Sequence, residues 1–437
     1  MSTTPTPART GDLVARDLTS VWHPFTQHAG WPTDDPLVVD HAEGMYLYDV
    51  DGRAYLDGVS SLWVSVHGHR VPEIDDAVRA QLDRIAHSTF LGLTHEPGIA
   101  LAEALLATAP AGLTRAFYCG DGATAVEAAL KMAYQSAQQR GEDRPLFVGV
   151  QEGYHGDTLG AVSVGAIDTF HATYRQILLE TRQIPSPADA RAGTAASLAE
   201  LERILDAEGD RVCAVAVEPM VQGAAGMLTH DAAFLQGVRA LCDRAGALMF
   251  ADEVATGIGR TGRMWAVEHA GVRPDLLTLG KGVTAGYLPL SAVLATEEVY
   301  EAFLGTPSSG RTFFHGHTYT GNPLACAAAL ANLELMAQRD TVAAAARAGD
   351  RLGALLEPLR ELDGVVDIRR CGTMTGIEVA PLLERTGFEV CRRARENGVL
   401  IRPLGDVVVL MPPLAIGDAD VDLLGSVVVD AVQKVVG

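Results

Sequence analysis

The chain has 437 residues, of which 48% are hydrophobic and 20% charged, and its formal net charge is -21. This length predicts two or three structural units with ample material for hydrophobic cores. The 55 acidic residues outnumber the 34 basic ones and no lysine or arginine cluster occurs, which argues against a nucleic-acid partner.

The chain begins with residues 1–11, which are rich in Pro, Thr and Ser and predict a disordered tail. The tail lacks an apolar signal core, and no later apolar run approaches the ~20 residues that span a bilayer. We therefore expect a cytoplasmic protein without a membrane partner. Residues 12–65 contain short strand-like runs with turn signals at Glu43-Gly44 and Asp51-Gly52, and predict the N-terminal part of a small domain.

Residues 66–335 alternate between helical and strand-like segments. EPGIALAEALLATAP and GATAVEAALKMAYQSAQQ have helical periodicity, and short apolar strands begin near residues 144, 211, 247 and 275. LQGVRALCDRAG predicts a helix between two of these strands. Continuous apolar strands separated by helices indicate a mostly parallel α/β sheet, and hence a large α/β domain.

A long helix is predicted to start at Asn322-Pro323, since Asn is a good N-cap and Pro is tolerated in the first turn. Residues 336–437 continue with helix, two strand-like runs and a last helix. They predict the C-terminal part of a small α+β domain.

Three charged residues fall at the ends of predicted strands: Glu218, Asp252 and Lys281. Open parallel sheets bind ligands at the carboxyl ends of their strands. Each residue alone is typical of an ordinary ion pair at a strand end, whereas three on one edge favour a shared site.

Asp252 and Lys281 together favour pyridoxal phosphate chemistry. This cofactor needs a lysine amine for a Schiff base and a carboxylate against its pyridine nitrogen. Lys281 lies in the apolar stretch TLGKGVTAGYLPLSA, where burial lowers the pKa of an amine and favours the neutral nucleophile. Its neighbours Gly280 and Gly282 leave room for a close approach.

A phosphate site is predicted where CGDGATAVEAALK opens a helix, because free backbone N–H groups and the positive helix end bind anions. Gly122 and Ala123 are the expected contacts. A Gly-Asp-Gly turn before a helix is also common without any ligand.

Several other motifs resemble known types of site, but their context argues against those sites. GIGRTG at residues 257–262 matches the dinucleotide pattern but lies beyond Asp252 rather than in a tight strand-to-helix turn. The six cysteines form no C-x-x-C pair and predict small core residues. No acidic partner accompanies the two H-x-H motifs, so we expect tight loops and no metal site; these histidines are His67, His69, His315 and His317.

The chain resembles the class III aminotransferases, which are fold-type I pyridoxal-phosphate enzymes, from about residue 20 onward. The resemblance rests on YHGDT, VEPMVQGAAGM, ADEVATGIGRTG, LTLGKG and HTYTGNPLACAAA, which occur in the family's order. It implies a mostly parallel large domain, a smaller α+β domain built from N- and C-terminal segments, small-molecule substrates and a homodimer with shared active sites.

The resemblance also implies residue roles. Lys281 would bind pyridoxal 5'-phosphate and move the proton, Asp252 would pair with the pyridine nitrogen, and Tyr154 would stack on the ring and border the substrate. Gly122 and Ala123 would contact the cofactor phosphate, and Glu218 would order the surroundings of the cofactor. His317 and Thr318 would reach the phosphate in the partner subunit. Trp63 and Gly316 would line the substrate pocket, and Arg402 would bind the substrate carboxylate.

Within the family, WHPFTQH, SSLWVSVHGH, STFLGLTHEP and IRPLGDVVVLMPP resemble the biotin-biosynthesis branch, which transfers an amino group to 8-amino-7-oxononanoate. Members that use S-adenosylmethionine as donor commonly carry Tyr where this chain has Phe25. Phe25 and the segment HGHT, which stands in place of HGPT, favour L-lysine as the amino donor. Phe25 is therefore among the expected substrate contacts. Another ω-aminotransferase, acting on a diamine, ornithine or β-alanine, is the alternative; a non-catalytic pyridoxal-phosphate protein would lack Lys281 or Asp252.

Overall fold

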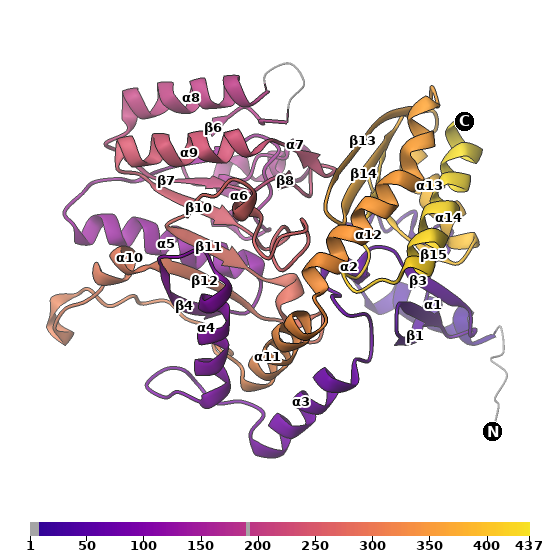
Figure 1. Ribbon diagram of the computed structural model, residues 1–437, viewed down its shortest axis with the longest axis horizontal. Coiled ribbons are helices and arrows are strands. Elements are labelled where there is room, and N and C mark those ends of the chain that lie inside the picture. Colours follow the sequence, from indigo (N-terminus) through magenta and orange to yellow (C-terminus); the bar gives the residue numbers. More distant parts are fainter. Residues whose placement is uncertain (1–7, 189–192) are drawn as a thin grey trace.

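The computed structural model describes residues 8–188 and 193–437, which form two lobes (Figure 1). Residues 1–7 of the predicted tail lie outside the described residues. The structure differs from the prediction at residues 8–11, which belong to helix α1 (Ala8–Ser20). The hydroxyl of Thr10 donates to Asp51 at 2.9 Å and ties this helix to the body of the protein, a contact that composition does not reveal.

The larger lobe is built on a seven-stranded sheet in the order β4-β12-β11-β10-β7-β5-β6. Strands β5, β6, β7, β10 and β11 pair in parallel, whereas β12 runs antiparallel between β11 and β4. The strands are β4 (Leu113–Cys119), β5 (Leu146–Val150), β6 (Thr181–Ile184), β7 (Val212–Val217), β10 (Leu248–Asp252), β11 (Leu276–Leu279) and β12 (Ser291–Thr296). The predicted mostly parallel sheet is therefore present, with one reversed strand that the apolar pattern could not reveal.

Helices cover both faces of this sheet. On β10, Phe250 packs in the core beneath α5, and its neighbour Met249 packs in the core beneath α8 and α9. A third core joins α3, α4 and α11 to the sheet. The helices are α3 (Pro72–Arg84), α4 (Glu96–Thr108), α5 (Gly122–Gln139), α6 (Leu159–Val164), α7 (Asp168–His171), α8 (Gly193–Glu208), α9 (Ala232–Ala245), α10 (Glu297–Glu301) and α11 (Pro323–Gln338).

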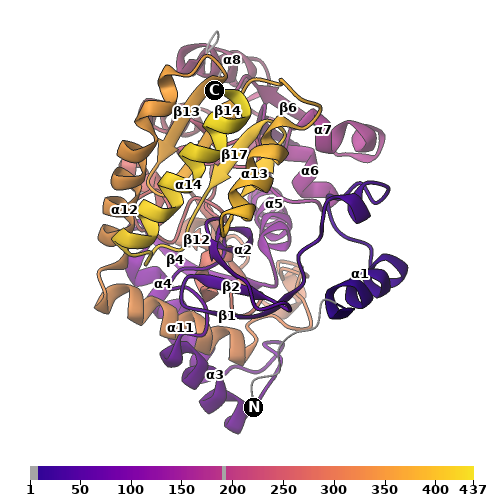
Figure 2. The same cartoon turned by 90° about the vertical axis from the view of Figure 1, so that its right-hand side faces the viewer.

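The smaller lobe combines both ends of the chain, as expected. Its sheets have the orders β1-β2-β3-β15 and β13-β14-β17-β16, and the parallel pair β3–β15 joins the N-terminal hairpins to the C-terminal segment. Helices α12, α13 and α14 cover these sheets (Figure 2). The strands are β1 (Val39–Glu43), β2 (Tyr46–Asp49), β3 (Ala54–Asp57), β13 (Val365–Cys371), β14 (Met374–Val379), β15 (Val399–Leu400), β16 (Arg402–Leu404) and β17 (Val407–Leu410); the helices are α12 (Thr341–Leu356), α13 (Thr386–Glu396) and α14 (Asp418–Val436).

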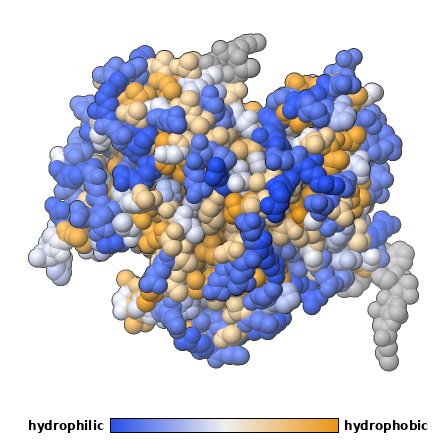
Figure 3. Space-filling view, viewed as in Figure 1, coloured by the Kyte–Doolittle hydropathy of each residue, from blue (hydrophilic) through white to orange (hydrophobic). Residues whose placement is uncertain are grey.

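The other elements of the described chain are short. They are α2 (Ser60–Trp63), the pair β8 (Val221–Gln222) and β9 (Leu228–Thr229), and the 3₁₀ turns η1 (Trp31–Thr33), η2 (Ala172–Ile177), η3 (Ala266–His269), η4 (Lys281–Thr284), η5 (Pro307–Ser309) and η6 (Glu357–Glu361). Hydrophilic residues cover much of the face seen in Figure 3, with apolar patches between them. No helix in the described part of the chain has the length and hydrophobicity needed to cross a membrane.

Candidate active site

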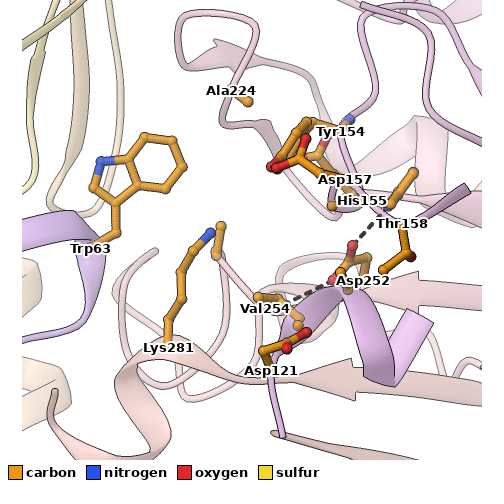
Figure 4. A pocket seen from close by; sticks show the side chains of 15 residues that line it. Trp63, Asp121, Tyr154, His155, Asp157, Thr158, Ala224, Asp252, Val254 and Lys281 are labelled. Atoms are coloured by element: carbon orange, nitrogen blue, oxygen red, sulfur yellow. Dashed lines mark hydrogen bonds and ion pairs between the residues drawn. The ribbon is translucent and has the colours of Figure 1, made fainter. Parts of the chain in front are cut away.

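The carboxyl ends of β5, β7, β10 and β11 border a cavity of about 440 Å³ between the lobes, which we call the inner cavity. Its walls include all three strand-end residues that the sequence singled out, Glu218, Asp252 and Lys281. Figure 4 shows Asp252 and Lys281 at this cavity. The parallel strands bring these residues to one edge although they lie far apart in the chain. The volume is within the usual range for a small-molecule site.

Asp252, the last residue of β10, is held by three hydrogen bonds. Its Oδ1 accepts from the Thr278 hydroxyl at 2.9 Å and from the Val254 N–H at 3.1 Å, and its Oδ2 lies 2.7 Å from Nδ1 of His155. Burial disfavours a charged His155, but the hydrogen bond and the charge of Asp252 outweigh it and raise the pKa of His155. The carboxylate is thereby fixed in orientation at the cavity wall.

Glu218 follows β7 and is buried. Its carboxylate accepts from the N–H of Tyr154 at 3.0 Å and from the N–H of Gly223 at 3.1 Å. Burial raises the pKa of Glu218 to about 7, against the opposing effect of His155. Glu218 therefore ties the loop after β5 to the loop after β7.

Lys281 starts the turn η4 directly after β11 and extends into the inner cavity. Its amine has no hydrogen-bond partner among the described residues and lies 4.6 Å from the centre of the Trp63 ring. Burial lowers the pKa of Lys281 to about 8, although Asp252 and Glu218 attract the charged form. At neutral to slightly alkaline pH a substantial fraction of this amine is therefore neutral and nucleophilic.

The start of α5 forms another wall of the inner cavity. Asp121 caps the helix by accepting from the Thr124 N–H at 2.9 Å, and Thr124 bonds back to the Asp121 N–H. The N–H groups of Gly122 and Ala123, the first two helical residues, have no acceptor in the described chain and border the cavity. Such groups at a helix N-terminus suit a phosphate.

A second cavity of about 510 Å³, the outer cavity, adjoins the inner one and shares Trp63, Tyr154, Ala224 and Lys281 with it. Most of its walls are apolar. It is further lined by Phe25, Leu62, Glu152, Ile167, Thr169, Phe170, Ala225, Arg402, Pro403, Leu404 and Gly405.

Two charged side chains in the outer cavity lack partners. Arg402, on β16, makes no hydrogen bond or ion pair with its guanidinium in the described part of the chain, which rules out the ordinary ion pair as its explanation there. Glu152, just after β5, is likewise without a cation on its carboxylate among the described residues. Besides the Lys281 amine that it shares with the inner cavity, the outer cavity thus offers, among the described residues, an unpaired guanidinium and an unpaired carboxylate on mostly apolar walls.

Backbone strain concentrates around these cavities. Non-glycine residues with positive φ include Phe25, Trp63, Glu152 and Lys281, all of which line one or both cavities. Such conformations cost about 1–3 kcal/mol each and gather at functional sites.

Strong local bonds hold the strained segment before Trp63. The Ser61 N–H donates to both carboxylate oxygens of Asp57 at 2.8 Å, and the Ser60 hydroxyl donates to the Met411 carbonyl at 2.6 Å. This segment aims the Trp63 ring at Lys281.

The remaining predicted residues fall in two groups. Tyr154 borders both cavities, and its hydroxyl donates to Asp157 at 2.9 Å. Gly316, His317 and Thr318 line neither cavity in this single chain; they lie in the loop before α11, where the His317 N–H donates to the Thr320 hydroxyl at 3.0 Å. Their predicted role in a partner subunit stays a prediction.

Among the site residues that sequence reasoning missed are three inside recognised motifs: His155, Asp157 and Thr278. All stand inside motifs that were noticed, YHGDT and TLGKG, but their partners lie elsewhere in the chain or depend on local geometry. His155 and Asp252 are 97 residues apart, and only the sheet order brings them together.

The other look-alikes have structural roles. Within residues 8–188 and 193–437, no three His, Cys, Asp or Glu side chains are grouped to hold a metal ion. The cysteines are free and five of them are buried, as the core prediction requires; Cys371 is half-buried. In GIGRTG, Arg260 is buried and donates to the carbonyls of Pro412 and Ser65, both at 2.7 Å, so this loop ties the lobes together.

The inner cavity fits pyridoxal phosphate in three respects. Asp252 offers an oriented carboxylate for a pyridine nitrogen, Lys281 offers an unpartnered amine for an aldehyde, and Gly122 and Ala123 offer free N–H groups for a phosphate.

Comparison with known proteins agrees with this geometry. The family model described as "Aminotransferase class-III" matches residues 29–432. The chain is 50% identical to a protein of Nitratidesulfovibrio vulgaris named adenosylmethionine-8-amino-7-oxononanoate aminotransferase, over 98% of this chain and 83% of that protein.

Solved structures of aminotransferases have the same fold as this chain. A crystal structure under that name from Methanocaldococcus jannaschii superposes with a TM-score of 0.93 at 38% identity, covering 97% of this chain and 99% of that one. An amine transaminase from an uncultivated Pseudomonas species, described as PLP-bound, superposes with a TM-score of 0.90 at 35% identity, covering 95% and 99%.

Proposed function

Because the chain belongs to the class III aminotransferases and is thus a pyridoxal-phosphate-dependent aminotransferase, we propose that it transfers an amino group to 8-amino-7-oxononanoate to give 7,8-diaminononanoate in biotin biosynthesis. The observation that carries the acceptor is the outer cavity, whose apolar walls lead from the Lys281 amine to the unpaired guanidinium of Arg402. This arrangement suits an acid whose methylene chain separates a reacting carbonyl from a carboxylate.

Each residue of the inner cavity has its own role in the proposed reaction. Bound pyridoxal phosphate supplies an aldehyde that carries the amino group and a ring that accepts electrons. Asp252 holds a proton at the pyridine nitrogen, and His155 and Thr278 keep its carboxylate in place. The neutral amine of Lys281 removes the proton from the α-carbon of the amino donor, as a general base, and later returns a proton as a general acid.

The outer cavity positions the substrates. Arg402 binds the carboxylate of 8-amino-7-oxononanoate through its planar guanidinium, and Trp63 and Tyr154 flank the reacting end. Gly122 and Ala123 hold the cofactor phosphate. Burial in apolar walls strengthens each of these charged contacts.

The amino donor is S-adenosylmethionine or L-lysine, and Phe25 favours L-lysine. The ring of Phe25 lines the outer cavity and lies 5.6 Å from the ring of Phe170 in an edge-on contact, so residue 25 itself offers a donor no hydroxyl. The name of the Nitratidesulfovibrio relative specifies adenosylmethionine for that protein.

A homodimer is also part of the proposal. Loops before α4 and α11 contact each other, since the rings of His87 and Tyr319 lie 4.7 Å apart. These two loops expose large apolar side chains, which we group as one patch: Leu91 (89% exposed), Leu93 (59%), Phe314 (81%) and Tyr319 (65%). An exposed apolar patch of this kind indicates an interface, and Thr318 and His317 stand within it.

The test is a product assay with purified, cofactor-loaded protein. We expect 7,8-diaminononanoate, detected by mass spectrometry, from 8-amino-7-oxononanoate with one of the two donors, and none with the Lys281→Ala variant. Faster amination of a diamine-derived aldehyde, an ornithine-derived aldehyde or malonate semialdehyde would instead support the alternative ω-aminotransferase.

A further inference from the structure

We propose that Glu152 binds the non-reacting ammonium group of the amino donor, so that the outer cavity selects donors that carry a second amine, such as L-lysine. This inference rests on the proposed function and deepens it by naming the class of donor. It concerns a residue to which neither the family motifs nor the resemblance gives a role.

Glu152 is placed where it can reach a substrate but not the chemistry. It follows β5 and precedes Tyr154, and its backbone N–H donates to the Ala166 carbonyl at 3.3 Å. It lines the outer cavity together with Arg402, but it is absent from the walls of the inner cavity, where Asp252 lies. A group bound by Glu152 is therefore remote from the cofactor ring.

The carboxylate of Glu152 lacks a counter-ion. In the described part of the chain no lysine, arginine or histidine pairs with it. Glu152 is exposed, but the desolvation that it does undergo and the nearby charge of Asp168 both raise the pKa of Glu152, so its surroundings disfavour the negative charge. Asp168 itself is paired with Arg175, whereas Glu152 is left to bind a cation from outside the chain.

The backbone at Glu152 is strained for this residue type. Its φ is +63°, in the left-handed region where Gly and Asn are much more comfortable than Glu. The same strain occurs at Lys281 and Trp63, which act in the site. The strain at Glu152 is explained if its side chain has a function that Gly could not perform.

The chemistry of the substrates selects the donor as the ligand. In 8-amino-7-oxononanoate the amino group is on the carbon next to the reacting carbonyl, so it stays beside Lys281. In L-lysine, whichever amine reacts, the other ammonium lies several carbons further out. Glu152 can pair with this second ammonium, and Arg402 is available for a carboxylate.

The experiment follows the loss of the cofactor's yellow absorption when a donor is added to the loaded enzyme without any acceptor. L-lysine is compared with L-norleucine, which has a similar chain but no second amine. In Glu152→Gln, which removes only the charge, we expect the half-saturating concentration of L-lysine to rise roughly tenfold or more, as for loss of a charged hydrogen bond. The value for L-norleucine should stay unchanged.

Two further variants distinguish an effect of the Glu152 charge on donor preference from an effect of its strained backbone. Asp168→Asn removes a neighbouring carboxylate outside the cavity and should leave the preference for L-lysine intact. Glu152→Gly relieves the strained φ, so it should unfold at an equal or higher temperature and still lose the preference. A Glu152→Gly enzyme that keeps the wild-type preference for L-lysine would overturn the proposal.

The remaining outcomes are equally decisive. Equal effects of Glu152→Gln on both donors, no effect on either, a wild-type enzyme without preference for L-lysine over L-norleucine, or an effect confined to S-adenosylmethionine would each overturn the role of Glu152. Because no acceptor is present, these results are independent of whether 8-amino-7-oxononanoate is the acceptor, which the product assay decides.

Discussion

Lys281 shows how one residue takes its reactivity from its surroundings. The amine has no partner among the described residues, sits against the Trp63 ring and is enclosed by the end of β11 and the start of η4. Burial opposes the charge more strongly than Asp252 and Glu218 favour it, and the pKa of Lys281 falls to about 8 from 10.5. The site thus supplies a neutral amine without a dedicated base.

This pKa predicts the pH dependence of cofactor uptake by the apoenzyme. Only the neutral amine attacks an aldehyde, so the rate should rise with increasing pH and level off above about 8. The growth of the yellow absorption after mixing with pyridoxal phosphate measures this rate, and Lys281→Ala is the blank. A rate that continues to climb toward pH 10.5, the ordinary value for lysine, would show that the amine is not enclosed as described.

Arg402 predicts a change in acceptor binding. Arg402→Met should raise the KM for 8-amino-7-oxononanoate by roughly tenfold to a hundredfold, because a charged hydrogen bond contributes about 1.5–3 kcal/mol. Arg402→Lys should recover only part, since lysine lacks the planar fork. The methyl ester of the acceptor should respond little to either change, and steady-state kinetics with acid and ester measure the difference.

Arg385→Met is the matched control. Arg385 is also on the small lobe, but it is paired with Asp34 and stacked over Phe388, outside both cavities. A similar loss of acceptor affinity in this variant would contradict a specific role of Arg402.

At the scale of elements, the start of α5 is the phosphate site that we propose for the cofactor. An added Cβ on Gly122 would approach Val254 Cγ1 to 2.6 Å, so the helix start and the loop after Asp252 are packed against each other without spare room. This contact places the free N–H groups of the helix beside the inner cavity.

Gly122→Ala should therefore weaken pyridoxal phosphate binding about tenfold and lower the free energy of unfolding by about 1–3 kcal/mol, the usual cost of overpacking. Gly237→Ala in α9 is the control, because its Cβ would meet Leu198 Cδ1 at 2.4 Å in a helix away from the cavities. It should cost similar stability and leave cofactor affinity unchanged. Cofactor titration and chemical unfolding of both variants test this, and equal affinities for the two would contradict it.

Element by element, the sequence was informative where local pattern and topology coincide. Apolar runs located β5, β7, β10 and β11, and their carboxyl ends had to converge because parallel strands share an edge. The run SAVLAT of β12 has the same apolar character whichever way the strand points, so its antiparallel direction could not be predicted.

The parts of the site that escaped prediction depend on contacts between distant segments. The pairing of His155 with Asp252 requires the order β10-β7-β5, which local pattern does not specify. Surrounding contacts impose positive φ values on Ser60, Trp63 and Glu152. A glycine at these positions would have indicated such a conformation in the sequence, but these residue types do not.

At the scale of the whole molecule, the site lies between the two lobes. The N- and C-terminal segments meet in β3 and β15, and this pairing sets Trp63 and Arg402 on the same cavity. The patch of Leu91, Leu93, Phe314 and Tyr319 is left exposed in the single chain.

If this patch forms the dimer, Phe314→Asp should produce monomers. Activity should fall more than tenfold at low protein concentration and recover as concentration rises, because central apolar contacts dominate interface energy. Leu382→Asp, at a side chain that is also exposed (60%) but on the small lobe, should leave both mass and activity unchanged. Light scattering and activity measured over a dilution series test this; a fully active Phe314→Asp monomer would contradict shared sites.

In the proposed reaction, the inner cavity uses pyridoxal phosphate on Lys281 to deliver an amino group to 8-amino-7-oxononanoate. The most direct measurement is the near-visible spectrum of the loaded enzyme through one complete cycle. We predict that L-lysine or S-adenosylmethionine removes the yellow band and that 8-amino-7-oxononanoate, added after the donor is washed out, restores it within one equivalent. A band that never forms, or one that other keto compounds restore and 8-amino-7-oxononanoate does not, would contradict the account.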